Sequence, residues 1–144
     1  METEALKAEF VGHVFDEIDF EIETDSLVDF ALACGETQPR FVDPSDADFQ
    51  AVPNYLTRVH GRRSLPKGFQ FEMHRSFDAG KSVEVHGPVR PGDRITARSE
   101  IADVYEKTGR SGKMVFVVHR MRFFNQDEAH VATVDWRMVQ REFD

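Results

Sequence analysis

The sequence has almost no cysteine, no long apolar run and no excess of basic residues, and each lack excludes a class of protein. Its one cysteine, Cys34, cannot form an internal disulfide, so no disulfide framework holds this chain. No apolar run approaches the ~18–20 residues that a bilayer span needs. Residues 1–9 are acidic and lack a basic segment followed by an apolar one. We therefore predict no membrane span, no secretory signal and a cytoplasmic protein.

The scarcity of basic residues also bears on the partner. A formal net charge of −8 argues against nucleic acid, because phosphate binding needs a basic field. Residues 1–60 hold 14 acidic and 3 basic side chains, whereas residues 61–144 hold 12 acidic and 15 basic ones. An anionic ligand is therefore expected to meet the second half. A chain of this length can bury about two thirds of its unfolded surface, so residues 1–144 are predicted to form a single domain without a metal.

Hydrophobic periodicity predicts a strand and then a helix in the first quarter of the chain. Alternation over residues 13–22 is typical of a half-buried strand, and its apolar positions are Val14, Ile18, Phe20 and Ile22. Helical spacing follows, and its apolar face consists of Leu27, Phe30, Ala31 and Cys34. Thr24 or Ser26 is predicted to cap this helix, and Gly35 suits the C′ position. On this face Cys34 is predicted to be a small core residue and not a nucleophile.

Residues 36–68 contain four prolines and little periodicity, which predicts a long excursion. Short helices are expected around 45–50 and 54–60. An irregular segment of this length in a compact domain is usually functional or covers something.

Three runs in the last third of the chain predict a long antiparallel meander. They span residues 94–106, 113–125 and 130–142, and each shows strand-like alternation. The middle run is apolar on both faces over 114–118, which predicts a central strand. Such long strands, with few helical segments beside them, indicate an α+β protein with a strongly bent sheet around a helix.

The segment directly after the predicted helix, residues 35–43, reads GETQPRFVD. It resembles the G-D-x-N-P-[IL]-H-x-D segment of the MaoC-like dehydratases and (R)-specific enoyl-CoA hydratases, with Gly35, Pro39 and Asp43 in register. Residues 87–95 read GPVRPGDRI and are similar to the R-P-[LV]-x-x-G-D-x-[IL] strand entry of that family. The resemblance covers roughly residues 12–142. It implies a hotdog fold, a long antiparallel sheet wrapped around a helix, and is closest to the N-terminal-type, non-catalytic domains.

In that family an Asp and a His hold a water and add it across the double bond of an enoyl thioester. Here Glu36 occupies the Asp position and Phe41 the His position. Glu36 could replace the Asp with a longer reach, but a phenyl ring cannot carry a proton. A positioned acid or base contributes ~10²–10⁴-fold, so the resemblance and the substitution together predict a non-catalytic subunit. Such a subunit would pair with a catalytic hotdog and shape a pocket for a bulky acyl group, such as a steroid side chain or a long fatty chain.

Several other residues are candidates for contacts with an acyl-CoA. Arg40 and Asp43 flank the lost His, and Asp43 is predicted to cap a helix that Pro44 begins. A basic hairpin could contact the phosphates of coenzyme A through Lys107, Arg110 and Lys113. Replacement bases could come from His60, His74 and His86, whereas His119 has apolar neighbours and is predicted to be a core or edge residue. No pair has metal-ligand spacing, so we predict no metal and no cofactor beyond the coenzyme A thioester of the substrate.

Two other functions fit the same scaffold. One is a hotdog acyl-CoA thioesterase, in which Glu36 or Asp43 would activate water. The other is a homodimer that binds acyl-CoA without chemistry. All three functions predict an oligomer, either a homodimer or a heteromer, and none predicts contact with nucleic acid or a membrane.

Overall fold

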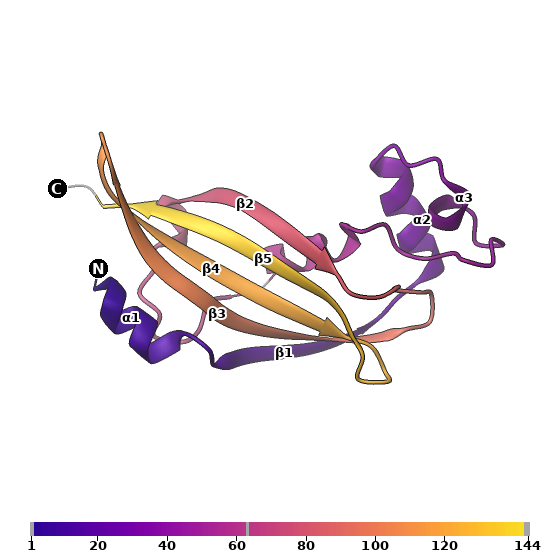
Figure 1. Ribbon diagram of the computed structural model, residues 1–144, viewed down its shortest axis with the longest axis horizontal. Coiled ribbons are helices and arrows are strands. Elements are labelled where there is room, and N and C mark those ends of the chain that lie inside the picture. Colours follow the sequence, from indigo (N-terminus) through magenta and orange to yellow (C-terminus); the bar gives the residue numbers. More distant parts are fainter. Residues whose placement is uncertain (1, 63, 143–144) are drawn as a thin grey trace.

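The computed structural model describes residues 2–62 and 64–142, apart from the side chains of residues 60–62. One antiparallel sheet of five strands runs the length of the molecule in the order β1-β3-β4-β5-β2 (Figure 1). The strands are β1 (Val14–Glu21), β2 (Ser76–Val85), β3 (Arg94–Gly109), β4 (Gly112–Phe124) and β5 (His130–Arg141). The predicted meander is confirmed as β3, β4 and β5, and β4 is the central strand of the sheet.

Two strands differ from the prediction. Strand β2 was not expected, because most of its side chains are exposed and it shows no clear alternation. Strand β1 has a bulge between Val14 and Asp16, which shifts the register against β3. The prediction that Val14 faces the core is therefore wrong, since its side chain is 54% exposed. Phe15 packs against the core instead.

The predicted helix is α2 (Thr24–Ala33). It begins after Glu23 without a side-chain cap, so neither Thr24 nor Ser26 caps it. At its other end the N–H of Glu36 donates to the carbonyl of Ala31 and the N–H of Gly35 to that of Leu32, a Schellman arrangement. Gly35 has a φ of +77°, which confirms the predicted C′ position.

The prediction for the last turn of this helix is wrong. Cys34 is exposed rather than buried, because the turn that carries it extends past the core. A second helix, α1 (Thr3–Phe10), was not predicted, and its Leu6 packs under the far end of the sheet.

The excursion after α2 covers the inner face of the sheet. It contains the helix α3 (Pro39–Val42) and the 3-10 helix η1 (Tyr55–Arg62) near the predicted 54–60 helix. The short 3-10 helix η2 (Met73–Arg75) comes after it. No helix forms over 45–50, where the chain makes turns, and Pro39 rather than Pro44 begins a helix. The excursion residues buried in the core are Phe41, Phe49, Val52, Tyr55 and Leu56, and the buried Phe69 and Phe71 follow directly after it.

The core consists of two clusters on the inner face. The first lies at the α2 end, where Leu27 and Ala31 of α2 pack with Ile95, Met121 and Phe123 of the sheet. The second lies at the α1 end, around Leu6, Ile101, Val117 and Met138. Helix α2 thus covers one end of a long bent sheet (Figure 1), and the α+β class is confirmed. Within the described residues no helix is both long enough and apolar enough to cross a membrane.

Candidate functional site

The segment that aligns with the family's acid/base pair forms the connection between α2 and α3. The carboxylate of Glu36 turns back onto this connection and accepts the backbone N–H groups of Thr37 and Gln38, with N···Oε1 distances of 3.0 and 3.1 Å. These two bonds lower the pKa of the exposed Glu36 carboxyl below its ordinary value, and the nearby Arg40 adds to the effect. Glu36 is therefore held ionised in a local structural role, which makes it a poor proton donor near neutral pH.

The lowered pKa of Glu36 predicts a pH-dependent contribution to stability. The bonds favour the ionised form, so the contribution is fully present above the ordinary value of 4.5 and is lost as the pH falls through the lower pKa of the folded state. We expect the difference in Tm between the wild type and Glu36→Ala to be constant at pH 6–8 and to shrink in acid. Thermal melts from pH 3 to pH 8 measure it. A difference that grows in acid would contradict this assignment.

Phe41, at the position of the family's His, is a core residue. Its side chain is 5% exposed and packs in the cluster at the α2 end of the sheet. The guanidinium of Arg40 lies over the Phe41 ring, with Cζ 4.5 Å from the ring centroid. Both side chains line a cavity of about 170 Å³. Its remaining lining residues are Gln50, Ala51, Val52, Pro53, Tyr55, Leu56, Val85, Gly87, Val89, Val131 and Ala132.

None of the described residues that line this cavity is a His, Asp, Glu or Lys. The space beside Phe41 can accept apolar groups, but its lining has no side chain that exchanges a proton near neutral pH. Of the lining side chains, Arg40 stays protonated and the phenol of Tyr55 ionises only in alkaline solution.

Asp43 closes α3 instead of beginning a helix at Pro44, so the predicted capping role is wrong. Its Oδ1 accepts the backbone N–H of Ser45 at 2.9 Å and the Ser45 hydroxyl at 2.7 Å, an Asx turn. The hydroxyl bond, followed by the N–H bond, lowers the pKa of Asp43.

Substitution of Asp43 is expected to affect the turn and not a reaction. Asp43→Ala removes both bonds and should lower the Tm by no more than a few degrees, whereas Asp43→Asn keeps an acceptor and should leave the Tm within about one degree of the wild type. Differential scanning fluorimetry distinguishes the two. Unchanged melts combined with loss of acyl-CoA hydrolysis in both variants would instead make Asp43 a reacting group.

The basic hairpin lies far from this segment. Lys107, Arg110 and Lys113 lie around the β3–β4 turn, at the opposite end of the sheet from α2 and α3 (Figure 1). Lys113 contacts Glu106 at 2.9 Å and Glu142 at 3.3 Å, and its hydrogen bond to Glu106 raises its pKa. Within one protomer, therefore, the five predicted substrate contacts form two separate groups. Arg40 and Asp43 lie at one end of the sheet, and the basic hairpin at the other.

The histidine side chains that the structure describes do not gather around Phe41. His74 is exposed on η2, and His119 is buried on β4 beside Phe15, as predicted for a core residue. His86 lies 4.4 Å from His130 between ring centroids, and both contact the hydroxyl of Thr133. Burial, followed by the charge of His86, lowers the pKa of His130. The side chain of His60 lies outside the described residues.

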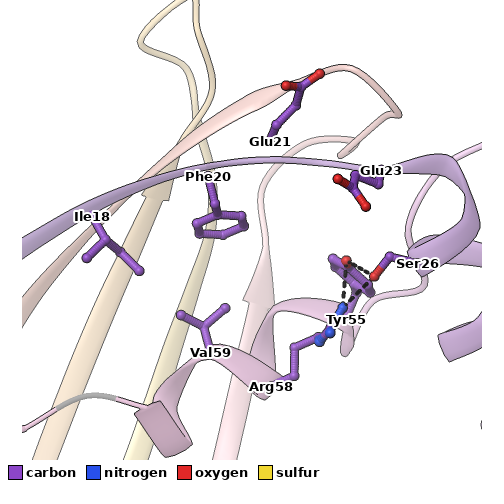
Figure 2. A pocket seen from close by; sticks show the side chains of 8 residues that line it. All are labelled: Ile18, Phe20, Glu21, Glu23, Ser26, Tyr55, Arg58 and Val59. Atoms are coloured by element: carbon purple, nitrogen blue, oxygen red, sulfur yellow. Dashed lines mark hydrogen bonds between the residues drawn. The ribbon is translucent and has the colours of Figure 1, made fainter.

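Sequence reasoning missed a second cavity, of about 300 Å³, between β1, α2 and η1 (Figure 2). Ser26, Tyr55 and Arg58 form a hydrogen-bonded triad at its wall. The only available signal was the i, i+3 spacing of Tyr55 and Arg58, which is too common to indicate a site. Over the described part of the chain, no cluster of three His, Cys, Asp or Glu side chains could hold a metal ion.

Comparisons with known proteins agree with this geometry. The sequence model of the FAS1-like dehydratase domain region matches residues 9–134. A UPF0336 protein of Streptomyces avermitilis is 28% identical, and the match covers 95% of this chain and 96% of that protein.

Solved structures share the fold at low sequence identity. The C-terminally truncated HadBC complex of Mycobacterium tuberculosis, a 3R-hydroxyacyl-ACP dehydratase, has a TM-score of 0.70 at 21% identity over 92% of this chain and 98% of that one. A MaoC-like dehydratase of Rhodospirillum rubrum has a TM-score of 0.64 at 20% identity, and the match covers 92% of this chain and 94% of that one. The ChsH1–ChsH2 complex of Mycobacterium tuberculosis has a TM-score of 0.66 at 15% identity, and the match covers 95% of this chain and 87% of that one. The predicted MaoC-like hotdog fold is confirmed.

Proposed function

Because this chain belongs to the family of the FAS1-like dehydratase domain region, we propose that it is the non-catalytic subunit of a MaoC-type hydratase or dehydratase that acts on acyl thioesters. A second hotdog chain with an intact Asp and His supplies the acid/base pair. This chain completes the oligomer and provides part of the wall around the acyl group.

The observation that carries the proposal is the environment of Phe41. Its ring is buried in the core at the α2 end, where it packs with residues of α2, the sheet and the excursion. A side chain integrated in this way is a structural replacement of the His, and its cavity is lined largely by apolar groups that suit an acyl chain.

Strand β2 offers the surface for the second chain. It lies at the edge of the sheet, and Phe77 and Val85 on it are 61% and 51% exposed. An edge strand offers unpaired backbone groups to another chain, and exposed apolar side chains on it mark a candidate interaction surface. The HadBC and ChsH1–ChsH2 structures are named as complexes, which supports a heteromer as the native state.

The thioesterase alternative has less support. It needs a carboxylate that takes a proton from water, yet local hydrogen bonds lower the pKa of both Glu36 and Asp43 and so weaken them as bases. The acyl-CoA-binding homodimer differs from the main proposal in its partner, a second copy of this chain, and in the absence of any reaction.

The test of the proposal is recovery of the partner from the native cell. Affinity purification with this chain as bait should recover a hotdog protein whose Asp and His are both present, in stoichiometric amount. The bait with Phe77→Lys and Val85→Lys should recover much less of it. Recovery of this chain alone, together with binding of acyl-CoA, would favour the homodimer instead.

A further inference from the structure

We propose that the cavity between β1, α2 and η1 binds an uncharged apolar molecule through a single carbonyl oxygen, which Ser26, Tyr55 and Arg58 hold. The proposal depends on this cavity alone and goes beyond the proposed function, because it needs neither the second subunit nor turnover.

The cavity has an apolar wall and a polar end. Ile18 and Phe20 of β1 face Val59 of η1 across it, while the triad occupies the end nearest α2 (Figure 2). Its volume of about 300 Å³ is at the lower limit for a small-molecule site. A ligand with an apolar body and one polar group at its end matches this arrangement of the cavity wall.

Counting hydrogens shows that the triad has more donors than its three side chains can accept. Arg58 Nη1 donates to Ser26 Oγ at 2.6 Å and to Tyr55 Oη at 2.8 Å. The two hydroxyls are 2.7 Å apart, so one of them donates to the other. One hydroxyl hydrogen is then left over, and the guanidinium retains further N–H donors. The group that completes the cluster is therefore a hydrogen-bond acceptor.

The triad is already fixed in position. Tyr55 is only 5% exposed, its ring packs edge-on against Phe30 with centroids 5.4 Å apart, and the Arg58 guanidinium lies 5.0 Å above its centroid. Ser26 lies in the first turn of α2, whose N-terminus carries a partial positive charge and has no side-chain cap. Because the donors are already held in place, binding of an acceptor does not incur the entropic cost of ordering their side chains.

The charges around the triad favour a neutral acceptor. Arg58 is the one cationic side chain among the described residues of the lining, and Glu23 turns toward Tyr55 and Ser26 (Figure 2). A second acid, Glu21, also lines the cavity, but its side chain points away from the triad (Figure 2). A ligand carboxylate would meet this negative charge, whereas a ketone, ester or thioester carbonyl would meet only the donors.

In the experiment, the isolated chain is titrated with methyl octyl ketone and, separately, with decanoate. Binding is monitored by changes in the amide chemical shifts in NMR spectra. We expect saturable shifts at Ser26, Tyr55 and Arg58 with the ketone, and weaker binding of decanoate. Tyr55→Phe and Ser26→Ala should each weaken ketone binding by about 2- to 10-fold, the usual effect of one hydrogen bond. Ser82→Ala, a serine on β2 outside the cavity, should bind the ketone like the wild type.

A charge variant tests the ligand class. Glu23→Gln should raise the affinity for decanoate and leave that for the ketone unchanged. Equal ketone affinity in the wild type and the Ser26→Ala/Tyr55→Phe double variant would overturn the proposal, as would tighter binding of decanoate than of the ketone by the wild type. Should the double variant fail to fold, Ser26→Ala and Arg58→Gln singly decide the same question. The same titration with an acyl thioester of N-acetylcysteamine tests whether the triad holds a thioester carbonyl as it holds the carbonyl of the ketone.

Discussion

Hydration of crotonyl-CoA by the isolated chain is expected to proceed at the rate of the buffer control. The reaction needs one group to activate water and one to move a proton, and each contributes ~10²–10⁴-fold. In this chain the first position holds Glu36, whose carboxylate is bound to backbone N–H groups, and the second holds the buried Phe41. The complex with the catalytic partner is expected to be at least ~100-fold faster than this chain alone.

Loss of enoyl absorbance measures both rates. The matched control is a complex in which the partner's His is replaced and this chain is unchanged; it should fall to the rate of the isolated chain. Robust turnover by the pure chain would contradict the non-catalytic assignment. In that case His60, His74 and His86 should be replaced by Gln in turn, to find which of them acts as the base.

The parts of the fold that the sequence predicted are those with a strong local pattern. Alternation over a dozen residues suffices for β3, β4 and β5, because one face of each strand is buried. Gly35 was predictable as a C′ residue since the left-handed φ of +77° strongly favours glycine. Phe41 was identified through the resemblance to the MaoC-like segment, in which the same position holds a His whose imidazole moves a proton.

The errors arose where tertiary position overrides the local pattern. Cys34 lies on the same helical face as the buried residues Leu27 and Ala31. The spacing along a helix gives the direction of a side chain, but it does not show whether another element packs against that side chain. No side chain of strand β2 is fully buried, so the strand lacks the alternation that identifies a strand in a sequence. The triad joins positions 26 and 55, and no local pattern predicts a contact over that separation.

Replacement of the two exposed apolar residues of β2 is expected to dissociate the oligomer. The wild type should be a dimer or larger, because β2 is an edge strand and Phe77 and Val85 are 61% and 51% exposed. Phe77→Lys/Val85→Lys places two positive charges along this edge. If β2 pairs with a copy of itself, like charges face each other across the interface and each Lys must also lose water.

Multi-angle light scattering at micromolar concentration should therefore report a 16.5 kDa monomer for the double variant and a multiple of that mass for the wild type. The control is Val14→Lys on β1, the other edge of the sheet, where the side chain is 54% exposed. It adds a positive charge to an edge of similar exposure and should leave the oligomer intact. Dissociation by Val14→Lys alone would move the interface to β1. A wild type that is itself a stable monomer and recovers no partner from the native cell would leave the exposed edge of β2 uncovered, and the proposed function would fail with it, because an acyl site shared between two chains requires the second chain.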